Sequence, residues 1–292
     1  VFGGTKVNQF NPDEPITKFI NSISTLFFKD NYMKLYNKEF AGATYGQDVG
    51  NNFYLRGTLE YQQLKPLFNT TDQAFIKTED VYSSNNPLFP DDNLTPAIEQ
   101  HHLTKASVFT RINFGNKYIS RPDGKLNIRN NDYPTLYFGY ENAFASNESK
   151  YEYQLITGQV RYDFDAGNKG TLGINLKAGT FIHGDNISFV DYKHFNGNRT
   201  HVGTSDRYLN VFNLMDYYSN STNKSYFEAH LEHNDKGYIM IKIPLLNKLN
   251  STLVLGFHAL AVPDTKPYTE FTVGLDNLGF GKLKVFRFDY VH

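Results

Sequence analysis

Apolar and polar side chains alternate over long stretches of this chain, and this alternation limits its possible folds more than any other feature. In residues 53–62, Leu55 and Leu59 share one face, whereas Arg56 and Glu60 share the other. Successive side chains of a β-strand point to opposite faces of a sheet. A period of two therefore predicts strands that separate an apolar environment from a polar one.

The alternation recurs from residue 31 to the end of the chain and predicts about eleven strands. Most of them exceed the five or six residues usual in soluble sheets and reach the length that a tilted membrane crossing needs. The predicted strands span residues 33–46, 51–64, 104–118, 134–145, 151–165, 170–182, 207–218, 225–240, 251–262, 267–277 and 282–292.

Composition agrees with a membrane-spanning sheet. Aromatic residues make up 16% of the chain, with 25 Phe and 21 Tyr, although the mean hydropathy is −0.50. No window approaches 18 consecutive apolar residues, so that only a closed barrel of strands could cross a bilayer. We therefore expect an all-β fold: the C-terminal part of a transmembrane, antiparallel outer-membrane β-barrel with apolar outward and polar inward side chains.

Two predicted hairpins give a consistent strand register. Folding the chain about Gly167 places Val160 opposite Ile174, and the same operation on a later hairpin pairs Ala259 with Phe271. Apolar residues then meet across the strands. A slip of one residue would turn every side chain to the other face, and therefore the agreement supports the pairing.

Connection lengths are a second indication, because bacterial barrels have short periplasmic turns and long extracellular loops. If the last strand ends in the periplasm, the short turns at 166–169 and 263–266 are periplasmic, and the long connections 65–103 and 183–206 lie on the other side. An odd number of strands does not suit a single-chain bacterial barrel. We therefore expect further strands before Val1, or a count that is wrong by one.

The two ends of the chain support the expectation of a fragment. The chain begins at Val1 without an initiator Met or a signal peptide. We expect an export signal to have been removed or to lie upstream. The last strand resembles the terminal assembly signal of outer-membrane proteins, which normally ends on an aromatic residue, and this predicts a residue or two missing after His292.

We divide the chain into a lead-in segment, residues 1–30, and the barrel strands, residues 31–292. The lead-in segment should contain one short amphipathic helix, because a start signal at residues 13–15 precedes apolar residues at helical spacing. Either this helix packs against the barrel wall or lumen, or it lies in the membrane interface. The apolar residues are Ile16, Phe19, Ile20, Ile23 and Phe27.

Several functional classes lack support in the sequence. There is no cysteine, which excludes disulfides and thiolate chemistry. The 29 basic and 30 acidic residues are well mixed, and therefore no nucleic-acid partner is expected. We find no nucleophile elbow, phosphate-binding loop, dinucleotide fingerprint or zinc-protease motif. We predict no enzyme, no catalytic residue and no cofactor.

One group of polar residues could form a site inside the barrel. Glu228, His230 and Glu232 should share the inward face of one strand, and folding the next hairpin places His258 opposite Glu232. Two histidines and two carboxylates could hold a divalent metal. The alternative, which we prefer, is a cluster of cross-strand charge pairs with no metal.

A short basic and apolar stretch, residues 242–249, is predicted to be an extracellular loop. Ile243, Leu245 and Leu246 would form an exposed apolar patch there unless something covers them. Either the loop folds over the barrel mouth, or it is a docking surface for another outer-membrane protein.

Five segments between residues 186 and 277 resemble the C-terminal barrel of an uncharacterised family of Bacteroidota outer-membrane proteins. They are NISFVDYKHFNGN (186–198), YFEAHLEHN (226–234), KIPLLNKL (242–249), KPY (266–268) and GLDN (274–277). The resemblance implies a barrel in the bacterial outer membrane. It also implies an upstream carboxypeptidase-regulatory-like domain, a non-catalytic β-sandwich that is absent from this chain.

Our leading functional hypothesis is a non-enzymatic scaffold or accessory subunit of a cell-envelope protein assembly or export complex. The expected partners are outer-membrane lipid and other outer-membrane or periplasmic proteins. One alternative is a transport barrel in which Arg56, Arg161, Lys177 and Glu228 line a solute path. A second alternative is a surface hydrolase, whose catalytic residues need not follow a sequence motif.

Overall fold

The computed structural model describes residues 1–70, 72–76, 79, 81–122, 124–128, 130–203, 208–244, 246–281 and 283–292, and it leaves out the side chains of residues 125, 127, 246 and 280. Within this part, eleven strands form one antiparallel sheet. In sheet order they are β1 (Phe2–Gln9), β2 (Leu35–Val49), β3 (Phe53–Pro66), β4 (His101–Asn113), β7 (Thr135–Phe144), β8 (Tyr153–Asp165), β9 (Thr171–Ile182), β10 (Ser225–Asn234), β11 (Thr252–Ala261), β12 (Tyr268–Phe280) and β13 (Leu283–Val291). The strands β5 (Lys117–Arg121) and β6 (Gly124–Ile128) form a separate hairpin.

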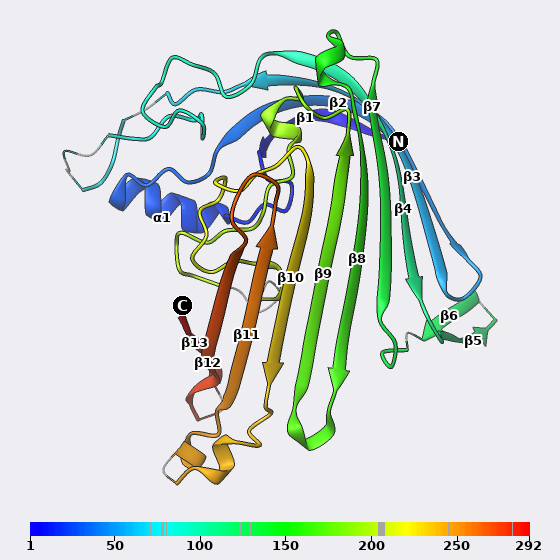
Figure 1. Ribbon diagram of the computed structural model, residues 1–292, viewed down its shortest axis with the longest axis vertical. Helices are drawn as coiled ribbons and strands as arrows, with labels where there is room; N and C mark the ends of the chain where they lie inside the picture. Colours follow the sequence, from blue (N-terminus) through cyan, green and yellow to red (C-terminus); the bar gives the residue numbers. More distant parts are fainter. Residues whose placement is uncertain are drawn as a thin grey trace.

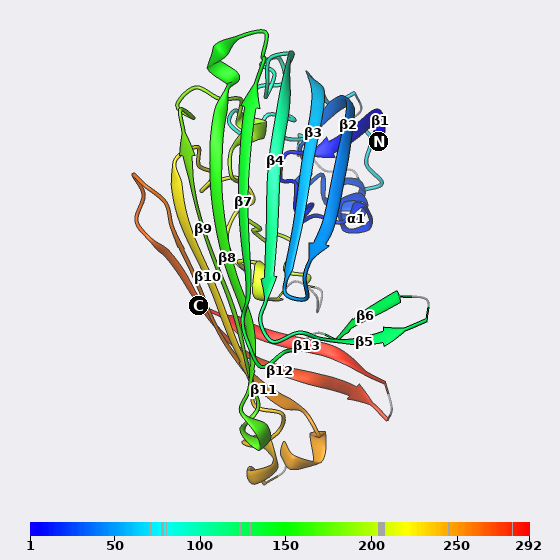
Figure 2. The same cartoon turned by 90° about the vertical axis from the view of Figure 1, so that its right-hand side faces the viewer.

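The large sheet curls into an open trough (Figures 1 and 2). Each strand pairs with the next strand of the sheet, and β1 and β13 form its two edges. In the part of the chain described, these edges do not pair with each other, and so the sheet is not closed. The helix α1 (Lys18–Phe28) lies on the open side of the trough (Figure 1).

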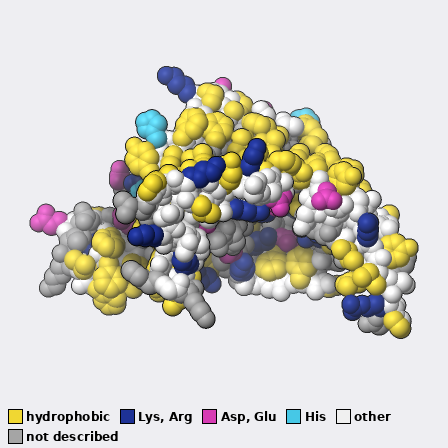
Figure 3. All heavy atoms as spheres, turned by 90° about the horizontal axis from the view of Figure 1, so that it is seen from below, with side chains coloured by type: hydrophobic (Ala, Val, Ile, Leu, Met, Phe, Trp, Pro, Cys, Tyr) yellow, Lys and Arg dark blue, Asp and Glu magenta, His cyan; other side chains and the backbone are white. Residues whose placement is uncertain are grey.

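The predicted alternation of faces is confirmed. Leu55 and Leu59 are exposed on the convex face of β3, whereas Gln62 and Leu64 are buried on its concave face. Hydrophobic side chains gather along the outer, convex side in the view from below (Figure 3). The exposed convex residues include Val108, Phe138, Tyr140, Ile156, Phe227, Leu255, Phe271 and Val273.

The predicted positions of the long connections are wrong. Residues 67–100 and 183–224 connect strands at the end of the sheet where β13 finishes, which we call the upper end as it is drawn in Figure 1. The short turn 166–170 lies at the lower end. The error arises because residues 208–218, which were predicted to belong to a strand, form none, and each strand that is added or removed reverses the direction of all strands before it.

Residues 208–218 instead form part of a long inward-folded connection. In this segment η4 (Tyr208–Asn210) is a short 3₁₀ turn, and residues 204–207 lie outside the described part. The backbone N–H groups of Asn213 and Leu214 both donate to the carboxylate of Glu270, at 2.7 Å each, and not to a neighbouring strand. A side chain 56 residues further along the chain therefore satisfies the backbone that a strand would have paired.

Two further boundaries differ from prediction. The first strand, β1, pairs with β2 along its whole length, although residues 1–30 were expected to contain only a lead-in helix. The strand β10 ends at Asn234 and not at residue 240. There the carboxylate of Asp235 accepts hydrogen bonds from the backbone of Gly237, Ile239 and Leu253 and turns the chain.

The hairpin registers differ from prediction by two residues. Val160 lies opposite Leu176 and not Ile174, and Phe271 lies opposite Phe257 and not Ala259. A shift of two preserves the face of every side chain, since the side-chain period is also two. The apolar and polar faces were therefore assigned correctly although the paired residues were not.

The helix α1 starts later than the predicted signal at residues 13–15. The hydroxyl of Thr17 caps it by accepting from the backbone of Ile20, and a left-handed Lys29 ends it. None of its described residues is buried. Phe27 contacts the ring of Phe75 in the connection 67–100. The two alternatives, a helix that packs on the wall and one that lies in a membrane interface, both stay predictions.

Residues 183–203 and 208–224 enter the trough from the upper end and occupy its upper part. We call this segment the plug. Its buried apolar side chains pack against inward residues of the sheet, as when Phe195, Phe212 and Met215 cluster with Tyr226 and Leu260. The plug and the concave face thus share the apolar core that the exposed convex face lacks.

Candidate functional site: the concave face and its plug

The inward cations under the plug lie beside carboxylates. Lys177 contacts Glu228 at 3.1 Å, and Lys105 contacts Asp191 at 2.6 Å. Lys38 similarly pairs with Glu60 across β2 and β3. Because a buried charge without a partner is very costly, these pairs allow the plug to cover the charged wall.

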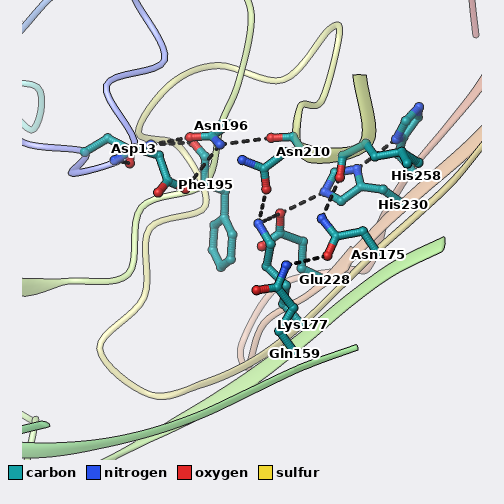
Figure 4. A network of polar contacts seen from close by, with 12 residues as sticks. Asp13, Gln159, Asn175, Lys177, Phe195, Asn196, Asn210, Glu228, His230 and His258 are labelled. Carbon is teal, nitrogen blue, oxygen red and sulfur yellow. Dashed lines mark hydrogen bonds and ion pairs between the residues drawn. The ribbon is translucent and has the colours of Figure 1, made fainter. Parts of the chain in front are cut away.

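The predicted polar cluster exists in part, as Figure 4 shows. His230 and His258 lie directly opposite each other on β10 and β11, with their Nδ1 atoms 2.8 Å apart. The Nε2 atom of His230 lies 2.8 Å from Oε1 of Glu228, and the same oxygen accepts from Lys177. The result is a continuous chain of contacts from Lys177 through Glu228 and His230 to His258.

The plug seals this cluster from water. Glu228, His230 and His258 are 1%, 0% and 2% exposed. The ring of Phe212 lies 4.7 Å from that of His230, and the side chain of Asn210 contacts Lys177. The cluster therefore binds the plug to the wall through both polar and aromatic contacts.

Glu232, the fourth predicted member, does not join the cluster. It lies opposite Gly256 and not His258, and its carboxylate accepts from Arg287 at 2.8 Å. Arg287 also donates to Asp289 and covers the ring of Tyr208. Among the described residues, no group of three or more His, Asp or Glu side chains is arranged to hold a metal ion.

A second polar cluster was not predicted. Lys105 lies between Asp191 of the plug and Glu141 of β7, and the hydroxyl of Tyr153 donates to Glu141 at 2.6 Å. A pocket of about 480 Å³ lies between these wall residues and the plug. Alternation places the wall residues inward. No local pattern brings Asp191 to them, because it comes from a connection without a period.

His194 of the plug is buried among aromatic rings. Its ring lies 4.9 Å from Phe189 and 5.6 Å from Tyr218, and Nδ1 lies 2.7 Å from the hydroxyl of Ser221. Burial, followed by the nearby charge of Lys193, lowers the pKa of His194 from 6.5 to about 3. This histidine is therefore neutral at physiological pH.

The predicted docking loop is only partly described. Leu245 and the side chain of Leu246 lie outside the described part. Ile243 is exposed, as are Ile239 and Ile241 just before it, and η5 (Met240–Lys242) forms the start of the loop. The loop lies at the lower end of the sheet, opposite the end from which the plug enters.

These features define a class of protein: a curved antiparallel sheet with an apolar convex face and a polar concave face that its own connection plugs. In the described part, no helix has both the length and the apolar character needed to cross a membrane. No curated protein matches the chain.

Residues 1–275 match the C-terminal domain of a family of unknown function, DUF5686, and the chain belongs to this family. The match agrees with the predicted resemblance to an uncharacterised family. It also extends that resemblance from residues 186–277 to most of the chain.

Proposed function

We propose that this chain forms part of the wall of an outer-membrane β-barrel, and that it acts as a non-enzymatic scaffold or accessory subunit of a cell-envelope protein assembly or export complex. The observation that carries the proposal is the division of the sheet into an exposed apolar face and a plugged polar face. A Bacteroidota origin and an upstream regulatory-like domain, which the sequence resemblance implies, belong to the same proposal.

The convex face supports a lipid environment. Leu59, Phe138 and Phe271 are more than half exposed, and similar residues adjoin them on neighbouring strands. Soluble proteins rarely expose continuous apolar surfaces of this kind, whereas barrels direct them to lipid.

The open edges set a condition for closure. Within the described residues, each strand of the large sheet runs antiparallel to its neighbours. The first and the eleventh strands of the sheet, β1 and β13, therefore run in the same direction. Pairing them directly would give one parallel ladder. A closed barrel with antiparallel pairs throughout therefore needs an odd number of additional strands between the two edges. Closure itself is required in a bilayer, where unpaired backbone groups find no water.

The plug favours a scaffold over a transporter. Phe195 and Phe212 are buried in the trough, and the ion pair between Asp191 and Lys105 joins the plug to the wall. The exposed isoleucines at positions 239, 241 and 243 provide an apolar surface outside the trough where a protein partner could dock. A chain with this arrangement would act by holding a protein partner in place, which supports a non-enzymatic role.

The membrane part of the proposal can be tested at two adjacent positions on β3. Leu59→Arg places a cation on the convex face, and Thr58→Arg places one on the concave face. Insertion of the purified protein into phosphatidylcholine vesicles should weaken by about 2–4 kcal/mol for the first variant if residue 59 lies near the bilayer centre, and much less for the second. Equal effects, or a wild type that stays soluble without detergent, would refute the proposal.

The scaffold part calls for purification of the native protein in mild detergent. Stoichiometric envelope proteins should co-purify, and Ile241→Asp in the exposed loop should release at least one of them. Ile119→Asp, in the exposed β5–β6 hairpin, is the matched control. A lone, monodisperse protein would count against a scaffold, and steady conductance across a planar bilayer would favour the transport alternative.

A further inference from the structure

We propose that the lower part of the concave face binds a small oxyanionic ligand, one that carries phosphate or carboxylate groups. The site consists of Arg56, Arg111 and Arg161, which we call the arginine patch. This inference goes beyond the scaffold role, and it requires only that the sheet is folded.

The sheet register brings the arginine patch together with aromatic rings. Arg56 lies directly opposite Phe109, and Arg111 lies opposite Tyr54 on one side and Tyr137 on the other. Arg161 occupies the next inward row on β8, opposite Asn175 of β9. All three side chains therefore lie on the same face and at the same end of the sheet. Arg56 and Arg111 are on the adjacent strands β3 and β4, and Arg161 is on β8, which β7 separates from β4.

The arginine patch differs from the cations under the plug. Lys105 and Lys177 contact carboxylates at 2.6 and 3.1 Å, and Arg287 contacts Glu232 at 2.8 Å. In the described part of the chain, no carboxylate forms such an ion pair with Arg56, Arg111 or Arg161. Arg56 and Arg161 are moreover exposed. Three positive charges thus remain available to a ligand.

Aromatic rings contact two of the three guanidinium groups, those of Arg56 and Arg111, without using their donors. The guanidinium carbon of Arg56 lies 4.9 Å from the ring centre of Phe109, and that of Arg111 lies 5.1 Å from that of Tyr54. A guanidinium that stacks on a ring still directs N–H groups along its edges. The Nε atom of Arg111 is buried and has no hydrogen-bond partner among the described residues. A planar oxyanion group can accept two of these N–H groups at once.

Two separate hollows, one beside Arg111 and one beside Arg161, leave room for a ligand, and Arg56 lines neither of them. One hollow, of about 230 Å³, is lined by Arg111, Tyr54 and several amide side chains, and by one carboxylate, Asp48. Another, of about 400 Å³, is lined by Arg161, Phe109 and the plug residue Lys193. The second hollow lies within the size range of small-molecule sites, in which rings and a few polar groups set the orientation. Asp13 also lines it and would limit the number of negative charges on the ligand.

The test uses the whole chain in phosphatidylcholine nanodiscs and isothermal titration calorimetry with pyrophosphate, citrate and glycerol 3-phosphate. We expect saturable binding of at least one anion, and weaker binding as NaCl screens the charges. Pyrophosphate or citrate as the best ligand would indicate a free anion, whereas glycerol 3-phosphate would indicate a lipid headgroup.

The variants separate the arginine patch from general charge. Replacing Arg56, Arg111 and Arg161 together by Met should weaken binding by about tenfold or more, since charge-assisted hydrogen bonds are lost. Replacing all three by Lys should give an intermediate affinity, because the charge remains but the planar donors do not. The matched control replaces three exposed lysines in ion pairs, Lys150, Lys224 and Lys236, by Met.

Each result bears on the proposal. Loss of binding in the Met variant but not in the control supports it, provided that circular dichroism shows an unchanged fold. Equal binding by the Met variant and the wild type, or no saturable binding of any of the three anions, would overturn it. A failure of the scaffold proposal would instead appear as missing partners, with anion binding unaffected.

Discussion

The upper and lower halves of the concave face have the same alternating sequence pattern, but their charged side chains have different partners. Under the plug, cations such as Lys105 and Lys177 contact carboxylates, and the surrounding side chains are buried. In the arginine patch, Arg56 and Arg111 rest against rings, and no described carboxylate forms an ion pair with either. Charges that serve stability have partners within the chain. Charges without such partners are candidates for function.

The upper and lower halves of the trough also differ in how far the plug covers them. The upper half is covered by the plug, although a pocket of about 480 Å³ remains between the plug and the wall. The lower half has a hollow of about 230 Å³ beside Arg111, and a hollow of about 400 Å³ beside Arg161 extends to the plug residues Lys193 and Asn210. Changes in the upper half should therefore alter stability most, and changes in the lower half should alter binding. The following variants test that division.

The largest effect is expected for Glu228→Ala. Glu228 is only 1% exposed, and its carboxylate contacts both Lys177 and His230. The variant would leave these two side chains buried without that carboxylate. Chemical denaturation in detergent micelles should show a loss of about 3–5 kcal/mol in the free energy of unfolding. Glu39→Ala, which breaks a partly exposed pair with Lys65, should cost less than about 1 kcal/mol. Similar losses for both variants would remove the distinction between buried and exposed pairs.

A smaller loss is expected for Leu260→Ala, on the concave face of β11. Leu260 is 1% exposed and packs with Phe195 and Phe212 of the plug, so the variant leaves a cavity worth about 3 kcal/mol. Leu255→Ala changes the same residue type on the convex face of the same strand, where the side chain is 42% exposed. Denaturation midpoints in micelles should fall clearly for the first variant and slightly for the second. The reverse order would mean that the plug is not the core.

Acid should loosen the plug through His194. Its pKa is lowered to about 3 in the folded chain and is 6.5 for an ordinary histidine. Between these values the unfolded chain binds more protons, so stability falls as the pH falls below 6.5, by up to about 1.4 kcal/mol per pH unit. His194→Phe should remove this contribution to the slope. His201→Phe, at an exposed position, should keep the wild-type slope in denaturation curves measured from pH 7 to pH 4.

The smallest effect on stability is expected for Arg56→Met. Its side chain is exposed, and its described contact is with the ring of Phe109. The free energy of unfolding should therefore change by about 0.5 kcal/mol or less. If anion binding weakens in this variant while stability is retained, the arginine patch is a binding surface. A loss as large as that of Glu228→Ala would instead make Arg56 part of the structural framework.

Most of the sheet could be predicted from local alternation, because each strand exposes one face and covers the other. The inward positions of Glu228, His230 and His258 follow from this pattern. The predicted count of eleven equals the number of strands in the large sheet, although for partly wrong reasons. The prediction omitted β1 and included residues 207–218, and it also missed the separate β5–β6 hairpin. The β1 segment has two successive glycines and little alternation, which left no local signal.

The candidate site could be predicted less well. Its wall residues lie on strands, but Asn210, Asp191 and Phe212 come from the plug, whose sequence has no period. Glu232 was assigned to the cluster because its pairing with His258 differed from the true register by two residues. The turns fix that register, and their exact geometry depends on contacts made elsewhere.

The amino-acid sequence by itself determined which residues look outward and which look inward, because the side-chain period of a strand is a local property of the backbone. Only the tertiary structure decided which inward residues are covered. The choice between strand and plug for residues 208–218 depends on a distant carboxylate, Glu270, that takes the backbone hydrogen bonds. Contacts between residues so far apart in the sequence cannot be predicted from a local pattern.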